Sequence, residues 1–175
     1  CAYEKAEAER IQTSVFEIIE ERIKDLPPQA IIYHPFIFGR IDQASARAGL
    51  YGLSAWHNKW NILRAVYEGI TCAHYDYIQS LMKLTDIKDV WLVGGGAASN
   101  IWGQIFADVT GFTVKIPKIN EIASRGVALS AGIGAGIFKD HQAANLPLEV
   151  RNEYVPNPAY NKRYAEQIQI YKKLN

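Results

Sequence analysis

Cysteine is scarce in this sequence of 175 residues, and long apolar runs are missing. The two cysteines, Cys1 and Cys72, form no CxxC pair and have no histidine at metal-ligand spacing, which favours a reducing, cytoplasmic compartment over a disulfide scaffold or a metal site. The longest run of small and apolar residues, 126–138, is too short for a membrane span of about 20 residues. The charged first residues also lack the apolar centre of a signal peptide. We therefore expect a cytoplasmic protein with no membrane partner.

An excess of charge of either sign is also missing. The chain has 19 Lys and Arg residues against 18 Asp and Glu residues, which leaves a net charge of +1. Nucleic acids and acidic membrane surfaces usually bind proteins that carry a basic surplus, so neither is expected as the main partner. Hydrophobic residues make up 49% of the chain, which is enough for the core of one domain of ordinary size.

Helical and extended patterns alternate along the chain. Apolar residues recur at helical spacing over residues 2–24 and again over residues 57–83. The other predicted elements are helices at 98–109, 122–138 and 158–174, strands at 30–34, 89–93 and 113–116, and a polar linker near 139–152. The alternation favours an α/β layer architecture. Three strands are few for a chain of this length, so we expect neighbouring strands upstream and exposed apolar edges near residues 30–40 and 113–117.

Three consecutive glycines, residues 94–96, separate the predicted buried strand at 89–93 from the next helix. Glycine tolerates positive φ and lets the backbone approach a ligand closely. The N-terminus of the following helix offers unpaired N–H groups and a positive dipole end to an anion. A nucleotide phosphate or ribose would fit there, and a tight turn with no ligand fits the glycines about equally well.

Two common nucleotide motifs do not match this stretch. A Rossmann dinucleotide site is disfavoured because Ser99 stands where the third glycine belongs, and because the next strand ends near Lys115 and Lys118 where an acid should hold the ribose. A Walker loop is excluded because no Gly-Lys-Ser/Thr follows the glycines.

The predicted helix at 122–138 carries small residues on one face, because Ala128, Gly132 and Gly136 recur every four residues. A backbone or a flat ligand could lie against such a face, and close helix packing is the preferred interpretation. Glu121, in the turn before this helix, is suited to complement its dipole.

Several stretches together resemble the FGGY family of carbohydrate kinases. Residues 94–108, the segment TGFTVKIP at 110–117, Glu121 and the GVA of residues 126–128 are similar to the signature stretch of that family. Further similar segments, in the same order, are HPFIFGR at 34–40, GLYG at 49–52, RAVYEG at 64–69 and the tyrosine-rich tail. The resemblance extends from about residue 30 to the C-terminus, and its details are most similar to the L-xylulose and xylulose kinases.

The resemblance implies a ribonuclease-H-like α/β fold of the actin/hexokinase ATPase type, incomplete here at its N-terminal side. It also implies an enzyme that transfers a phosphoryl group from ATP, with Mg²⁺, to an alcohol group of a sugar, and the expected substrate is a pentulose such as xylulose. Residues 1–175 would then be a C-terminal FGGY kinase domain fragment. Its expected parts are a leading helix at 1–28, a core at 30–138, and a linker and C-terminal helix at 139–175.

The resemblance places Gly95, Gly96 and Ala97 beside the ribose and phosphates of the nucleotide, and Asn100 near the adenosine. No residue corresponds to the catalytic aspartate or the sugar pocket of the family, so the chain alone is expected to be inactive. Its expected partners are the N-terminal portion of the same kinase and the sugar substrate, and a homodimer is the alternative assembly. A fragment or a processed product would also explain why the sequence begins with Cys1. The alternative function is a non-catalytic actin-like nucleotide-binding or interaction module.

Overall fold

The computed structural model describes residues 1–174, apart from the side chain of Asn100. Within this part the chain forms six α-helices, five short strands and one short 3-10 helix. The helices are α1 (Ala2–Ile11), α2 (Val15–Ile23), α3 (Lys59–Met82), α4 (Asn100–Thr110), α5 (Ile122–Gly134) and α6 (Pro158–Lys173). The strands are β1 (Ile32–His34), β2 (Gly49–Tyr51), β3 (Val90–Trp91), β4 (Val114–Pro117) and β5 (Val150–Tyr154), and the 3-10 helix is η1 (Gly95–Ala98).

The strands form two small sheets. β1 and β2 make an antiparallel pair, and β4 lies between β3, which is parallel to it, and β5, which is antiparallel. The expectation of an exposed edge at residues 113–117 is therefore wrong, because β3 and β5 cover the two edges of β4. The expectation of exposed apolar residues at 30–40 is confirmed for the loop that follows β1 but not for β1 itself. In that loop the side chains of Ile37 and Phe38 are 63% and 98% exposed.

The single helix predicted over residues 2–24 is in fact two helices. α1 ends at Ile11 and is followed by Gln12, whose φ of 55° lies in the left-handed region, and α2 begins after Ser14. The Ser14 hydroxyl caps α2 by accepting a hydrogen bond of 3.2 Å from the Phe16 N–H. Serine is favoured at N-caps over helix interiors, so this local preference outweighs the continuous apolar periodicity.

Helices α3, α4 and α6 and strands β1 and β4 lie where the sequence predicts them, within a few residues at each end. The predicted strand at 89–93 is reduced to the two residues of β3, which are half-buried rather than buried. α5 ends at Gly134, short of the predicted Phe138, because the N–H groups of Ile137 and Phe138 bond back to the Gly132 carbonyl. β2 and β5 were not predicted.

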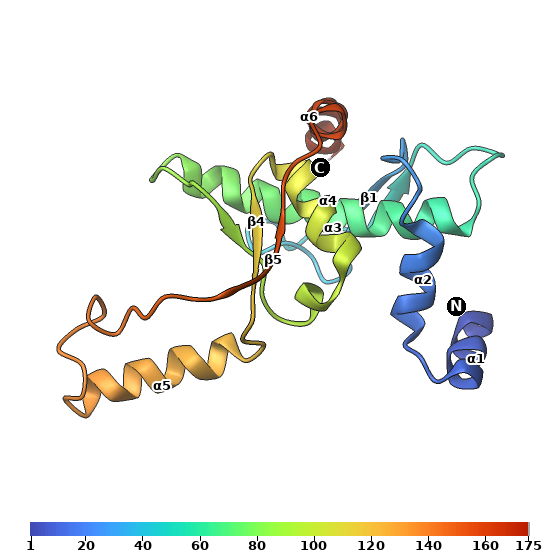
Figure 1. Ribbon diagram of the computed structural model, residues 1–175. Helices are drawn as coiled ribbons and strands as arrows, with labels where there is room; N and C mark the ends of the chain where they lie inside the picture. The colour runs from blue at the N-terminus through green and yellow to red at the C-terminus, as the bar shows by residue number, and fades with distance from the viewer. Residues whose placement is uncertain (175) are drawn as a thin grey trace.

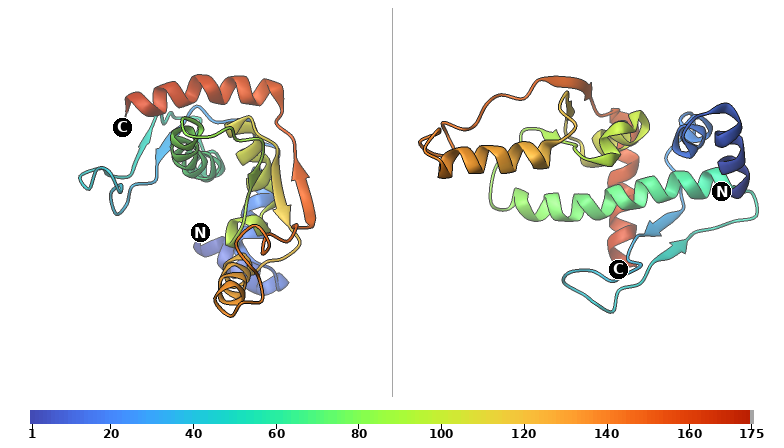
Figure 2. Two further views of the ribbon diagram at one scale, coloured as in Figure 1. Left: turned by 90° about the vertical axis from the view of Figure 1, so that its left-hand side faces the viewer. Right: turned by 90° about the horizontal axis from the view of Figure 1, so that it is seen from below.

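The hydrophobic core lies where α3, α4 and α6 meet β1. Figure 2 shows α6 crossing α3, and α6 packs on both α4 and β1. The core side chains are Ile32, Phe36, Ala46, Cys72, Ile105, Val109, Tyr164, Ile168 and Tyr171. β1 approaches α3 closely at Gly69, where a Cβ atom would lie 2.1 Å from the Tyr33 carbonyl oxygen. Only glycine permits this approach of strand to helix.

A buried ion pair joins four segments through α3. The carboxylate of Glu68 accepts hydrogen bonds of 2.8 Å from Arg64 Nε, 2.8 Å from the Tyr164 hydroxyl and 3.0 Å from the Gln29 N–H. The Arg64 guanidinium also donates to the Ile23 carbonyl at the end of α2. Because both side chains are buried, the loss of one partner would cost far more than the loss of an exposed i,i+4 pair.

Helix α5 stands apart from the rest of the molecule (Figure 1). Gly132 is the one buried residue of this helix, and Val127 is 70% exposed. The described contacts of α5 are with the segment that follows it: Arg125 donates to the Leu146 carbonyl at 2.7 Å, and the Phe138 ring lies over Gly132. The small-residue face is thus largely unpacked. No helix within residues 1–174 is long and apolar enough to span a membrane.

Candidate functional site

A cavity of about 580 Å³ lies between the glycine turn and the turn that joins β4 to α5. Both turns were singled out from the sequence, and the fold brings them together because β3 and β4 are parallel neighbours. The cavity is lined by Val93, Gly94, Gly95, Ala97, Ala98, Ile116, Pro117, Ile119, Asn120, Glu121, Ile122, Ala123 and Arg151.

The glycine turn redirects the chain from β3 into α4. Gly94 has a φ of 79°, which an L side chain rarely adopts, and its carbonyl accepts a 3.0 Å hydrogen bond from the Ala97 N–H. Ser99 then caps α4 by accepting a 3.0 Å bond from the Trp102 N–H. The first N–H groups of a helical turn have no acceptor within the turn, so those of Gly95 and Gly96 are left for another acceptor.

The predicted site residues differ in what surrounds them. Gly95 and Ala97 line the cavity, and among the described residues no heavy atom other than those of Gly95 and its two chain neighbours lies within 4 Å of a Cβ placed on Gly95. Gly96 does not line the cavity, because its Cβ position faces the Trp102 ring at 3.3 Å. Asn100 begins α4, and its side chain lies outside the described residues.

The opposite wall of the cavity is mainly apolar. Ile116, Pro117 and Ile122 supply much of it, at the end of β4 and the start of α5. Glu121 occupies the N-cap position of α5 and makes no side-chain capping bond, so its carboxylate is not engaged by that helix end. An apolar wall with a few polar groups at its rim suits a flat, partly polar ligand such as a nucleobase with its ribose.

Arg151 is the functional candidate that the sequence does not reveal. It projects from β5, and its guanidinium donates hydrogen bonds to the Ala97 carbonyl at 2.6 Å and to Asn120 Oδ1 at 3.4 Å. The residue falls in the segment predicted to be a polar linker, and no local motif marks it. Its position follows from the pairing of β5 with β4, which joins residues more than thirty positions apart.

The glycine turn is supported from behind by α3, because Trp102 Nε1, in the helix that follows the turn, donates to Thr71 Oγ1 at 3.0 Å. Burial raises the pKa of the Glu20 carboxylate, and the nearby Ser99 hydroxyl opposes that rise. The turn is therefore fixed to the molecular body on the side that faces away from the cavity.

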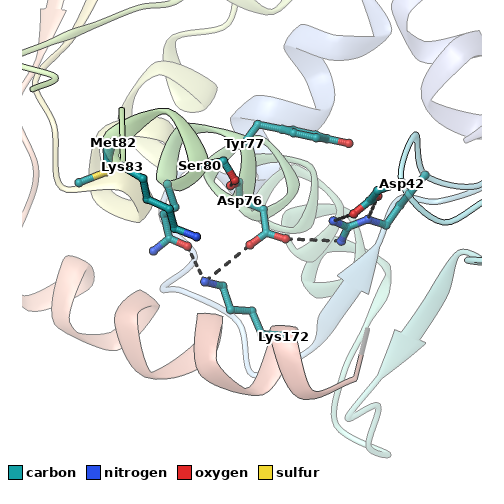
Figure 3. A pocket seen from close by; sticks show the side chains of 9 residues that line it. Asp42, Asp76, Tyr77, Ser80, Met82, Lys83 and Lys172 are labelled. Carbon is teal, nitrogen blue, oxygen red and sulfur yellow. Dashed lines mark hydrogen bonds and ion pairs between the residues drawn. The ribbon is translucent and has the colours of Figure 1, made fainter. Parts of the chain in front are cut away.

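Figure 3 shows a second cavity, of about 480 Å³. It shares no lining residue with the first. Arg40 Nε lies 2.9 Å from Asp42, the other end of its guanidinium lies 3.4 Å from Asp76, and Lys172 Nζ lies 3.7 Å from Asp76. These pairs join the loop after β1 to α3 and α6. Because the carboxylates largely neutralise the cations, the cluster has a structural role. Among the described residues, no three His, Cys, Asp or Glu side chains are grouped to hold a metal ion.

The chain is similar in sequence to known carbohydrate kinases. Residues 4–135 match the model of the FGGY family of carbohydrate kinases, C-terminal domain. The chain is 29% identical over 164 residues to the L-xylulose/3-keto-L-gulonate kinase of Escherichia coli K12, covering 91% of this chain and 33% of that protein. It is 31% identical over 176 residues to an autoinducer-2 kinase of Escherichia coli SMS-3-5, covering 95% of this chain and 33% of that protein. The chain thus spans about one third of the length of these relatives.

A solved structure shares the fold. The xylulose kinase from Rhodospirillum rubrum superposes with a TM-score of 0.78 at 21% sequence identity, over 91% of this chain and 33% of that one. At this identity the likeness is one of fold. The ribonuclease-H-like α/β class of actin/hexokinase-type ATPases, expected from the sequence, is confirmed.

Proposed function

Because this chain belongs to the FGGY family of carbohydrate kinases, we propose that it supplies the adenosine-side half of the ATP cleft in an enzyme that phosphorylates a sugar. The observation that carries the proposal is the 580 Å³ cavity, which joins a glycine turn at the start of a helix to an apolar wall. The wall suits the adenine ring, and the turn suits the ribose and phosphates.

Each site residue has a distinct part in this proposal. Gly95 and Ala97 face the nucleotide, since both line the cavity. A Cβ on Gly96 would point at the Trp102 ring and not into the cavity. Gly96 therefore contributes its backbone N–H to the proposed site. For Asn100 the family resemblance alone supports a place near the adenosine.

The proposed reaction is transfer of the γ-phosphoryl group of ATP to a sugar hydroxyl. The proton of that hydroxyl passes to an aspartate in the N-terminal portion of the kinase. Mg²⁺ would neutralise charge on the phosphates. Glu121 is the one carboxylate among the described residues that line the cavity, and alone it does not make a metal site, so we assign the ion to the phosphates and the N-terminal portion.

A pentulose such as xylulose is the substrate we propose, because the relatives include an L-xylulose/3-keto-L-gulonate kinase. Relatives named for autoinducer-2 show that neighbouring kinases act on other compounds, and the cavity described here lies on the nucleotide side. A thermal-shift panel of sugars on the full-length kinase would identify the substrate directly.

The N-terminal portion of the same kinase is the partner we propose for this chain, in preference to a homodimer. The relatives are about three times as long as the matched region. Val127 on α5 is 70% exposed, and Ile137 in the segment after α5 is 74% exposed. Packing of the remaining portion against α5 would cover this apolar surface. Neither nucleic acid nor a membrane is part of the proposal.

The test compares two neighbouring glycines in the full-length kinase. Gly95→Val places a branched side chain in the cavity, so we expect at least a tenfold rise in KM for ATP with little change in Tm or in KM for the sugar. Gly96→Val presses on the Trp102 ring, so we expect a lower Tm with a smaller change in KM for ATP. An unchanged KM for ATP in Gly95→Val would refute the nucleotide role of this cavity.

A further inference from the structure

We propose that Arg151 is a positioning residue of the nucleotide site, which bridges the two walls of the cavity and holds the glycine turn in its binding conformation. This inference rests on the proposed function and adds to it a residue from outside the glycine turn and the small-residue helix. Three observations carry it: a β-bulge, a pair of hydrogen bonds and an unpaired charge.

The first observation is a bulge in the pairing of β4 with β5. Ile116 lies opposite Asn152, whereas Pro117 lies opposite Val150, so Arg151 is an extra residue with no partner across the ladder. A bulge of this kind redirects a side chain out of the regular alternation, and bulges are over-represented beside active sites. Here the redirected side chain is one that lines the cavity.

The second observation is that the Arg151 guanidinium reaches both walls. It donates to the Ala97 carbonyl of the glycine turn at 2.6 Å and to Asn120 Oδ1 of the β4–α5 turn at 3.4 Å. Ala97 and Asn120 belong to different loops, and Arg151 connects them. The planar fork of arginine can donate in two directions at once, whereas a lysine ammonium on a single stem cannot span the same two acceptors in this geometry.

The third observation is the charge at the cavity. Within residues 1–174, no carboxylate lies within ion-pair distance of Arg151, although Glu121 lines the same cavity. A cation that is hydrogen-bonded to neutral acceptors keeps its positive potential, which favours an anionic ligand. Arg151 therefore both fixes the shape of the cavity and favours the phosphates of a nucleotide.

The test measures ADP binding to the full-length kinase by titration calorimetry, and amide hydrogen exchange of the same protein without nucleotide. In Arg151→Gln we expect ADP affinity to fall about tenfold, the usual effect of losing one charged hydrogen bond. The amides of residues 97–99 should exchange faster. Arg151→Lys keeps the charge but not the bridge, so its exchange should also be faster, with a smaller loss of affinity. Arg163→Gln, at an exposed position of α6, is the matched control and should change neither quantity.

Each outcome has one interpretation. Unchanged ADP affinity in Arg151→Gln overturns the inference, provided that the unsubstituted full-length kinase binds ADP. Weaker binding with unchanged exchange over residues 97–99 also overturns the positioning role, because Arg151 would then act on the nucleotide directly. If the unsubstituted full-length kinase does not bind ADP, the proposed function itself fails, and the role of Arg151 fails with it.

Discussion

Helices α3 and α5 both carry glycines and apolar residues at helical spacing, but only α3 is packed. α3 buries six residues, among them Arg64 and Glu68, and contacts β1, α2 and α4. α5 buries Gly132 alone. The difference shows that apolar periodicity indicates a face to be buried without indicating what will bury it. α3 gains its neighbours from within this chain, whereas those we propose for α5 lie in the N-terminal portion.

The largest expected effect comes from breaking the ion pair that anchors α3. Glu68→Ala leaves the Arg64 guanidinium buried without its carboxylate and removes the acceptor of the Tyr164 hydroxyl and the Gln29 N–H. We expect the free energy of unfolding to fall by about 3–5 kcal/mol, measured by urea denaturation. Glu166→Ala, at an exposed position of α6, is the control and should change stability by less than about 0.5 kcal/mol. Equal effects would contradict the special role of Glu68.

A glycine-to-alanine pair compares the two helices directly. In α3, Gly69→Ala drives a Cβ into the Tyr33 carbonyl and should cost about 1–3 kcal/mol or more. In α5, Gly126→Ala meets no heavy atom within 4 Å among the described residues and should stabilise the chain by about 0.5–1 kcal/mol, because alanine is the better helix former. Thermal unfolding of both variants measures the contrast, and the same sign in both would refute it.

The smallest expected effect concerns pH. Burial raises the pKa of Glu20, so its folded-state pKa exceeds the unfolded value. The folded state therefore holds this proton more tightly, and the stabilisation is complete below the unfolded pKa and is lost as pH rises through the folded pKa. Glu20→Gln should remove that pH dependence. Relative to the unsubstituted chain, the substitution should raise the free energy of unfolding more at pH 7 than at pH 4. Urea midpoints at both pH values test it, with Glu166→Gln as control.

Much of the fold follows from local pattern, and the parts that were missed depend on distant pairing. The long amphipathic repeat of α3 and the proline-led, basic α6 are strong local signals. β2 has only three residues and β5 is largely exposed, so no apolar alternation marks either strand. At Ser14 the error is reversed, because a local signal was overlooked in favour of a long-range pattern. The capping interaction of Ser14 divides a helix that apolar periodicity alone predicts to be continuous.

The candidate site was likewise predictable only in part. The glycine turn and the residues around Glu121 are recognisable from composition and spacing, and the structure brings them to one cavity. Sequence cannot indicate which glycine faces that cavity, because the rotation of the turn is set by Trp102 and Ser99. Arg151 could not be identified, because its place depends on a bulge between two strands rather than on its neighbours in sequence.

The crossing of α6 over the core has a consequence for biosynthesis. His34 Nε2 donates to the Tyr171 carbonyl at 3.1 Å, and Gln167 donates to the Ile31 carbonyl, so β1 is covered by residues synthesised more than 130 positions later. Until α6 has left the ribosome, the apolar side of β1 and the aromatic face of the core have no cover. Contacts of such long range slow folding, and exposed strands promote association with other chains. We therefore expect nascent chains stalled before α6 to remain bound to chaperones.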